Sequence, residues 1–273
     1  MKTLFPLFLC LFLCLLLLPA SAVLAAPQVE VGLSDVIRAV ETPFRSDAVR
    51  ERDTANSAII DFQAEFFQES HIASLERMQR GRGEVWLKFD RQRGGDLVPR
   101  AKFRWEYRQP TTQEIVSDGD TLWVYLPENN QVLRSDIEEA LRQDAENPVT
   151  FLTGLGNLSR DFLITWASPN RDVAGNFVIE LRPRRASPLM NRLLMVIDRD
   201  AVLRFDKDLR PELRQSTGAV FPVLSTTVFD PNGNSTLIEF QDRRVNTGLP
   251  DSLFEFVRPA GVEVVRPGEG FGF

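Results

Sequence analysis

The chain has 273 residues, with 38 acidic and 32 basic side chains and a formal net charge of −6. The sequence contains no stripe of basic residues, which argues against a nucleic-acid binder. The excess of acidic residues argues against adhesion to anionic lipid surfaces. The single histidine, His71, is expected in an exposed turn and cannot build a zinc cluster or a conventional histidine-based triad.

The first 26 residues are typical of a secretory signal peptide. Lys2 precedes an apolar run over 4–18, which is followed by small residues suited to a cleavage site. Both cysteines lie inside this run, so we expect an exported protein without disulfides or a lipid anchor. After removal of residues 1–26, residues 27–266 are expected to form one domain, followed by a short tail over 267–273.

The first predicted element is an amphipathic helix over 33–44, because its apolar residues recur at helical spacing. Ser34 is expected to cap this helix. The period then changes to two, which predicts half-buried strands around 62–66 and around Leu87. Residues 90–100, which are rich in Gly and Arg, interrupt this pattern and are interpreted as an insertion.

The strongest local signal is Asp118-Gly119 between two alternating apolar runs, which predicts a tight β-hairpin. In the preceding strand, Phe103 and Trp105 share one face. The strand after the turn has apolar side chains on both faces: Leu122, Trp123, Val124, Tyr125 and Leu126. A strand of this kind calls for an explanation of what lies on each face.

The second half begins with a predicted helix over 135–146 and a short apolar helix over 149–155. Strand-like alternation returns over 162–197 and in a hairpin over 223–241. The highly charged stretch 200–220 is interpreted as an insertion or a long loop. Roughly ten antiparallel strands with two or three helices indicate an α+β fold.

Few residues in the chain suggest catalysis. Asp230, Asn232 and Asn234 superficially resemble a calcium loop, but the glycine falls at the fourth position and Gln241 occupies the twelfth. A hairpin turn is therefore favoured over a metal site. Motifs for a serine nucleophile, a zinc protease or a phosphate loop are missing from the sequence. Carboxylates could still pair in space, so a secreted hydrolase that uses such a pair stays an alternative hypothesis.

The sequence around the Asp-Gly turn resembles the LolA family, the periplasmic carriers of bacterial lipoproteins. The resemblance rests on FRW (103–105), QP (109–110), VSDG (116–119), TLW-Y (121–125), NNQV (129–132) and the closing segment NTGLPDSLFEFVRPAGVEV (246–264). It implies an unclosed antiparallel β-barrel of about ten to eleven strands with a lid of short α-helices over a hydrophobic cavity. It also implies a protein that is not an enzyme and needs no cofactor or metal.

The inward-facing apolar residues are the candidates for the cavity lining: Phe62, Phe66, Leu87, Phe103, Trp105, Leu122, Val124, Phe151 and Leu152. The same positions would serve an ordinary packed core, and the sequence leaves both interpretations open. In the family, an arginine shortly before the F-x-W element bonds to the lid. Because the insertion falls at this place, Arg91 and Arg100 are the two candidates for such a latch.

The resemblance implies a soluble periplasmic protein of Gram-negative bacteria, and we expect it to be a monomer. It would accept triacylated lipoproteins released by an inner-membrane ABC transporter and deliver them to an outer-membrane acceptor. Each buried methylene stabilises a complex by about 0.8 kcal/mol, so acyl chains need an apolar groove to cross water. The alternative is a related half-barrel protein that binds or senses another amphiphile, a glycolipid or a mislocalised lipoprotein.

Overall fold

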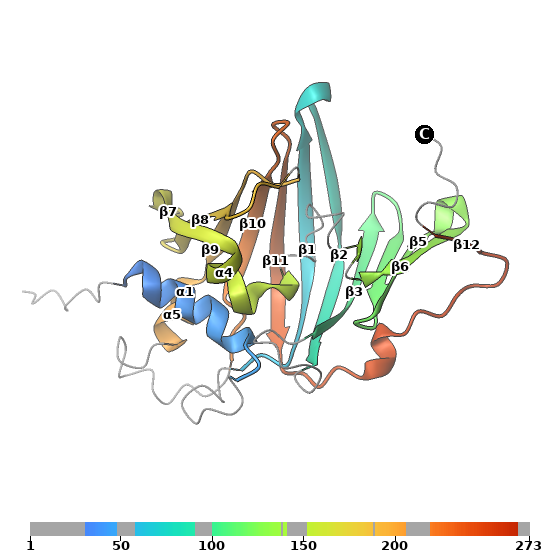
Figure 1. Cartoon of the computed structure of the whole chain (residues 1–273), viewed down its shortest axis with the longest axis horizontal. Coiled ribbons are helices and arrows are strands. Elements are labelled where there is room, and N and C mark those ends of the chain that lie inside the picture. The colour runs from blue at the N-terminus through green and yellow to red at the C-terminus, as the bar shows by residue number, and fades with distance from the viewer. Residues whose placement is uncertain are drawn as a thin grey trace, which may run out of the picture. The chain divides into compact units, whose positions relative to one another are not determined.

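The computed structural model of the chain is drawn in Figure 1. The structure describes residues 31–47, 58–90, 100–137, 139–140, 152–187, 189–205 and 219–266. They belong to one compact unit that spans 31–273. The predicted signal peptide, the predicted tail, Arg91 and Phe151 lie outside the described residues.

The described strands form one twelve-stranded sheet. The first half of the chain provides β1 (Asp61–Ile72), β2 (Arg77–Asp90), β3 (Arg100–Gln109), β4 (Gln113–Ser117), β5 (Thr121–Leu126) and β6 (Gln131–Asp136). The second half provides β7 (Phe162–Arg171), β8 (Phe177–Pro183), β9 (Arg192–Ile197), β10 (Val223–Phe229), β11 (Ser235–Val245) and β12 (Glu263–Val265). The spatial order is β12-β6-β5-β4-β3-β2-β1-β11-β10-β9-β8-β7, so two meanders meet where β1 pairs with β11.

Neighbouring strands are antiparallel except for β12, which runs parallel to β6. β12 and β7 stand at the two ends of the order, and the sheet is therefore not closed. The predicted fold class, α+β with an unclosed antiparallel sheet and short helices, is confirmed. The sheet has twelve strands, more than the predicted ten to eleven, and three-residue β12 is too short to produce a visible alternation.

The first helix forms where the apolar spacing predicts it. α1 (Leu33–Glu41) continues into a 3-10 turn, η1 (Thr42–Phe44). The predicted cap was wrong: Gly32 is the N-cap, and its backbone N–H donates to Asp35 Oδ2 at 2.9 Å. The carboxylate in the first turn satisfies this donor, which leaves no need for a hydroxyl cap at Ser34.

Two predictions of local structure require correction. Ser135 lies in strand β6, and helical residues begin only at Ile137, with Asp136 Oδ1 accepting the N–H of Glu139 at 3.2 Å. The remainder of the predicted helix, 141–146, and the start of the next, 149–151, lie outside the described residues.

The charged stretch 200–220 was interpreted as an insertion or a long loop, but its first residues belong to a helix, α5 (Arg199–Phe205). Asp198 Oδ1 accepts the backbone N–H groups of Asp200 at 2.9 Å and of Ala201 at 3.2 Å, as an N-cap does. The many charged residues in this stretch favoured the loop interpretation, so the N-cap at Asp198 was not recognised from the sequence. Residues 206–218 lie outside the described part of the chain.

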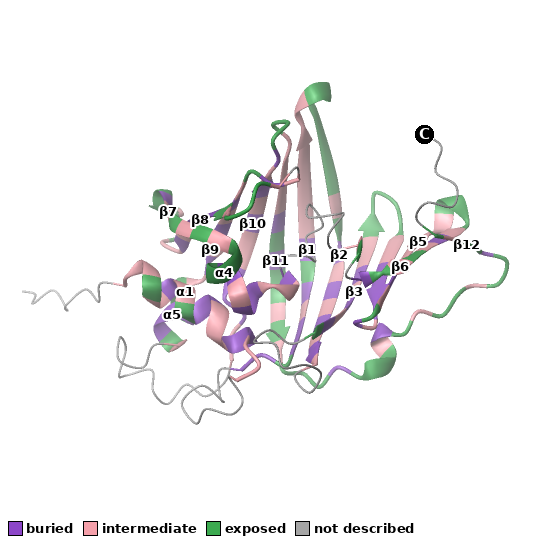
Figure 2. Ribbon diagram, viewed as in Figure 1, coloured by how far each residue is buried: buried purple, intermediate pink, exposed green. Residues whose placement is uncertain are grey.

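One face of the sheet carries the main core. Helical segments α1, η1, η5 (Leu155–Asn157) and α4 (Leu158–Asp161) supply side chains to the same buried cluster as the strands. Figure 2 shows buried residues along the strands beside these helices, whereas the hairpin tip between β1 and β2 is exposed. We call α1, η1, the helical residues 152–153, η5 and α4 the helical cover. The side of the sheet that it packs against is the inner face.

The opposite, outer face of β5 is covered by the C-terminal segment. The ring centroids of Trp123 and Tyr125 lie 6.1 and 6.2 Å from that of Phe256. Phe254, in the 3-10 turn η7 (Asp251–Phe254), is 1% exposed. This packing explains why β5 carries apolar side chains on both faces.

A buried carboxylate fixes the start of that segment. Asp61, in β1, is 2% exposed and accepts bonds from the backbone N–H groups of Thr247, Gly248 and Leu249 at 2.7, 2.8 and 3.2 Å. The Thr247 hydroxyl donates to the same carboxylate at 3.1 Å. Asn246 has a left-handed backbone and binds Ile60 N–H at 2.7 Å through its side chain. We call residues 246–265 the C-terminal strap.

Candidate functional site

Strand register brings most of the predicted lining residues together on the inner face. Leu87 lies opposite Phe62 on one side and opposite Phe103 on the other. The next row pairs Val85 with Trp105, and Trp105 with Ile115. These rows continue onto β5 through Leu122 and Val124, and Phe66 lies two positions along from the Ala64 that opposes Val85. The sequence alternation located this face correctly because side chains alternate strictly along a strand.

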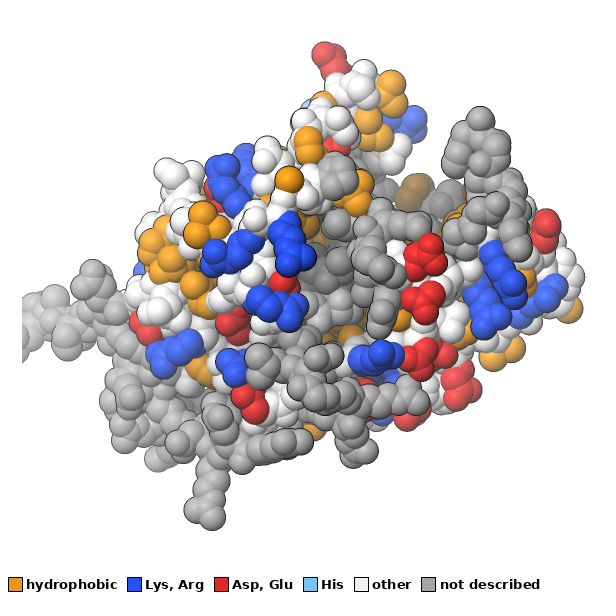
Figure 3. Space-filling model, in the orientation of Figure 1, with side chains coloured by type: hydrophobic (Ala, Val, Ile, Leu, Met, Phe, Trp, Pro, Cys, Tyr) orange, Lys and Arg blue, Asp and Glu red, His pale blue; other side chains and the backbone are white. Residues whose placement is uncertain are grey.

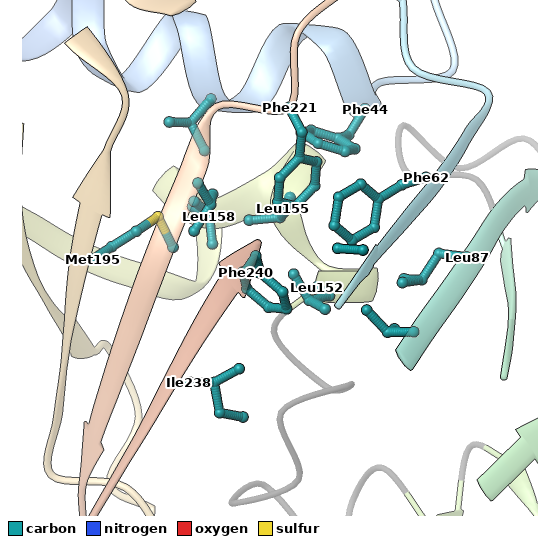
Figure 4. Packing of buried hydrophobic residues seen from close by; sticks show 14 of the residues in the cluster. Phe44, Phe62, Leu87, Leu152, Leu155, Leu158, Met195, Phe221, Ile238 and Phe240 are labelled. Atoms are coloured by element: carbon teal, nitrogen blue, oxygen red, sulfur yellow. The ribbon is translucent and has the colours of Figure 1, made fainter. Parts of the chain in front are cut away.

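These side chains pack against one another. The rings of Phe66 and Trp105 are 4.4 Å apart, and Trp105 is fully buried. Phe62 stacks on Phe221 at 3.7 Å, and Phe44 of the helical cover meets Phe221 edge-on at 5.8 Å, as Figure 4 shows for these three neighbouring rings. The structure thus shows a closed arrangement in which the inner face is filled by aromatic and aliphatic groups. Their use as an acyl-chain lining stays a prediction.

Leu152 is the predicted residue that comes from the cover and not from the sheet. It is 1% exposed and packs in the same cluster as Leu155 and Leu158, as Figure 4 shows. Its neighbour in the prediction, Phe151, lies outside the described residues. The covering face is thus apolar where it meets the sheet.

Close contacts hold the two parts of the cover together. A Cβ atom on Gly156 would lie 3.1 Å from the carbonyl oxygen of Phe44, so η5 and η1 approach each other closely here. Glu41 Oε1 accepts the backbone N–H of Ser159 at 2.5 Å, which links the end of α1 to α4. Nothing in the spacing of Glu41 and Ser159 along the sequence signals this bond.

Trp105 carries an unusual polar atom. Within the described part of the chain, its Nε1 is buried and has no hydrogen-bond partner. The neighbouring Tyr107 does find a partner, since its hydroxyl donates to Gln68 Oε1 at 2.7 Å. A Cβ atom on Gly81 would lie only 3.3 Å from the Tyr107 ring, so glycine here allows the ring to lie close to β2.

The two latch candidates have different outcomes. Arg100 begins β3, and its guanidinium pairs with Asp120 at 2.5 Å, in the turn between β4 and β5. This bond ties two parts of the sheet together. Arg91 lies outside the described residues. A latch between an arginine and the helical cover therefore stays a prediction.

A pocket among the described residues lies at another place. This pocket of about 640 Å³ opens between α4, the start of β7 and the end of β8. Apolar side chains in its wall are those of Leu158, Phe162, Pro183 and Met190. None of the predicted lining residues belongs to it. Alternation along strands cannot reveal a pocket formed by a helix end and a connecting loop.

Other groups that the sequence singled out are structural. Asp230 Oδ1 accepts the N–H groups of Asn232 and Asn234 at 2.9 and 2.7 Å, so this segment is a hairpin turn. His71 lies inside β1 and is half-buried, which corrects its expected position in an exposed turn. Across the described ranges, no group of three or more His, Cys, Asp or Glu side chains is placed to hold a metal ion.

No helix among the described residues has both the length and the apolar character needed to cross a membrane. An apolar sheet face beneath short helices forms the core of an α+β domain and also offers an apolar ligand a surface when the helices move. The fold and the site therefore define a candidate binding protein for such ligands.

The family model described as "Outer membrane lipoprotein carrier protein LolA" matches residues 57–207, which is more than half of the chain. The chain belongs to the LolA family. Members of this family are periplasmic carrier proteins and not enzymes.

Relatives cover almost the whole chain. It is 28% identical to the outer-membrane lipoprotein carrier protein of Alkalilimnicola ehrlichii, over 92% of this chain and 96% of that protein. The carrier protein of Coxiella burnetii is 27% identical over 81% of this chain and 88% of its own length. Among solved structures, a LolA superfamily protein from Nitrosomonas europaea gives a TM-score of 0.37 at 15% identity, covering 83% of this chain and 99% of its own.

Proposed function

We propose that this protein carries lipoproteins across the periplasm by holding their acyl chains between the inner face of the sheet and the helical cover. The observation that supports this most is the apolar surface on both sides of that boundary. Phe62 and Leu87 on the sheet meet Phe44 and Leu152 of the cover, and each is at most 1% exposed. An acyl chain that enters between them exchanges one apolar contact for another.

This exchange is favourable only when the acyl chain buries more apolar surface than the protein exposes by separating the cover from the sheet. Each methylene removed from water contributes about 0.8 kcal/mol, whereas separating the cover from the sheet exposes apolar side chains at a similar cost per area. Binding is therefore moderate, which suits a carrier that must release its cargo. Apolar contacts give no hydrogen-bond selectivity, so the shape of the opened space selects acyl chains.

The proposed partners follow from the family. An inner-membrane ABC transporter would release triacylated lipoproteins to this protein, and an outer-membrane acceptor would receive them. Export through the predicted signal peptide, residues 1–26, would place the protein in the periplasm. We propose that it acts as a monomer, with one lipoprotein bound per chain.

The test uses protein that lacks residues 1–26 and spheroplasts that hold a labelled triacylated lipoprotein in the inner membrane. We expect the lipoprotein to appear in solution as a one-to-one complex that later passes to outer membranes. Failure to release lipoprotein, with folded protein and an active transporter, contradicts the proposal. Free glycolipid found in the purified protein would then favour the amphiphile-binding alternative.

Two aromatic-to-leucine variants sharpen this test. Phe62→Leu changes the inner face, whereas Trp123→Leu changes the outer face beneath the C-terminal strap. We expect the first change to lower the yield of the soluble complex and the second to leave it near the wild-type level. Equal effects of both changes would indicate general destabilisation and not an acyl-chain site on the inner face.

A further inference from the structure

The pocket beside α4 has an apolar interior and a basic rim. Leu158 and Met190 are buried and belong to the main core, and Phe162 packs against that core. The pocket includes the start of β7 and the end of β8, at one end of the sheet order, whereas the predicted acyl-chain lining on the sheet lies on β1, β2, β3 and β5. The pocket shares α4 with the helical cover, but none of the predicted lining residues belongs to it.

Arginines dominate the charge around this pocket. Arg160, Arg184 and Arg185 contribute to its wall together with one acid, Asp161. Arg160 pairs with Asp161 at 2.9 Å, which neutralises both. Arg184 and Arg185 then give the rim a net positive charge on a chain whose total charge is −6. Figure 3 shows Lys and Arg side chains gathered on the face where α4 lies.

The rim is held in place by contacts to α4. Arg184 Nε donates to the carbonyl oxygen of Ser159 at 3.3 Å, and the Arg184 backbone N–H donates to the carbonyl oxygen of Asp161 at 2.9 Å. The guanidinium of Arg184 is thus positioned at the edge of the apolar pocket. Arg185 follows directly and is exposed. Planar guanidinium groups bind phosphate oxygens with two parallel hydrogen bonds.

We propose that this pocket binds a single-chain phospholipid with an anionic head, whose acyl chain fills the apolar interior and whose phosphate pairs with Arg184 and Arg185. The volume of about 640 Å³ falls in the range of small-molecule sites, about 300–1,000 Å³. The acyl chains of a lipoprotein carry no charge, so the proposed binding of those chains gives the basic rim no partner. The inference therefore goes beyond the proposed carrier function.

The test is calorimetric titration of protein lacking residues 1–26 with lysolipids below their micelle concentration. We expect lysophosphatidylglycerol to bind, and lysophosphatidylcholine of the same chain length to bind about tenfold more weakly, because its choline group meets the arginines. Binding of the anionic lipid should also weaken at high salt. Equal binding of both lipids, binding of neither, or equally tight binding of palmitate would overturn the proposal.

A matched pair of double variants locates the site. Arg184→Gln/Arg185→Gln should weaken lysophosphatidylglycerol binding by about tenfold. Arg77→Gln/Arg244→Gln removes the same charge from exposed positions outside the pocket and should leave the affinity unchanged. Equal effects of the two double variants would overturn the site assignment.

Two measurements distinguish this proposal from a loss of folding and from the proposed carrier function. Arg185→Gln alone changes an exposed side chain, so weaker lipid binding at an unchanged melting temperature excludes a loss of folding as the cause. The lipoprotein release assay should be unaffected by the Arg184→Gln/Arg185→Gln change. Lipid binding and lipoprotein release can therefore fail independently, and each result is assigned to its own site.

Discussion

Replacement of Asp61 by asparagine tests whether a buried carboxylate fastens the C-terminal strap to the sheet. Asp61 Oδ1 accepts the N–H and the hydroxyl of Thr247, and Oδ2 accepts the N–H groups of Gly248 and Leu249. The four donors come from residues that follow Asp61 by 186 to 188 positions. Asp61→Asn keeps the size of the side chain but leaves an acceptor on one side only.

The cost depends on which way the new amide turns. If its NH2 group faces Gly248 and Leu249, two backbone donors lose their acceptor. If it faces Thr247, one backbone donor does, because the hydroxyl can rotate and accept instead. Each unpaired buried donor costs about 1–3 kcal/mol, and the remaining bonds lose their charge assistance, so we expect a loss of about 2–4 kcal/mol. That is a large part of the stability of a typical domain, about 5–15 kcal/mol.

Urea unfolding followed by circular dichroism measures this loss, and hydrogen exchange locates it. Asp230→Asn is the matched control, because Asp230 is 7% exposed and also accepts four hydrogen bonds, all from the same turn. We expect faster exchange over the C-terminal strap in Asp61→Asn, and only over 231–234 in the control. A loss below about 1 kcal/mol, or an unchanged strap, would refute the argument.

Two further changes test the strap and the sheet. Hydrogen bonds from Lys88 and Lys102 hold the pKa of Asp251 below its ordinary value. A lowered folded-state pKa stabilises above the unfolded value, about 4, and this contribution disappears as the pH falls through the folded value. Asp251→Asn should therefore be slightly less stable than wild type to urea at pH 7 and equal to it below the folded pKa. In β2, a Cβ on Gly83 would lie 1.7 Å from the carbonyl oxygen of Glu106, so Gly83→Ala should cost more than about 2 kcal/mol in urea unfolding.

The comparisons for these two changes lie close by. Gly81→Ala adds the same methyl group to the same strand, but the nearest atoms belong to the Tyr107 ring at 3.3 Å, which can shift. We expect a loss within about 1 kcal/mol. Equal effects of the two alanines would contradict the close approach of β2 and β3 at Gly83. For Asp251, a stability difference between wild type and Asp251→Asn that does not shrink as the pH falls below about 4 would contradict the role given to the carboxylate charge.

Local patterns in the sequence predicted the sheet well. Alternation places Phe62, Leu87 and Phe103 on one face because a strand has a period of two, and the register follows from burying that face. The Asp118-Gly119 turn is also local: Asp118 Oδ1 accepts the N–H of Thr121 at 2.8 Å, and Gly119 has a φ of 97°. Each of these features depends on neighbours in the chain.

Features that depend on distant partners were not predictable. Asp61 occupies a polar position in the alternating pattern of its strand, and only the folded chain shows that the turn of Thr247–Leu249 surrounds it. The pocket beside α4 is formed by a helix end and a loop that meet through Arg184 and Asp161. Pairing of β12 with β6 likewise joins segments about 130 residues apart, and three residues give no periodic signal.

The two covers of the sheet differ in how they are attached, and this difference indicates which one yields to a ligand. The C-terminal strap is attached by hydrogen bonds from specific donors, such as Lys88 Nζ to the Leu249 carbonyl at 2.7 Å, and by the four bonds to Asp61. An acyl chain cannot replace these bonds, because it has neither donors nor acceptors.

The helical cover meets the inner face of the sheet mainly through rings and aliphatic groups, such as Phe44 beside Phe89 of β2 at 5.4 Å. An acyl chain provides an equivalent apolar surface at these contacts, whereas the hydrogen bonds of Arg184 to Ser159 and Asp161 hold α4 only beside the end of β8. We therefore expect ligand binding to raise hydrogen exchange in α1 and α4 and to leave the C-terminal strap protected. Faster exchange in the strap, with an unchanged helical cover, would place the acyl chains on the outer face instead.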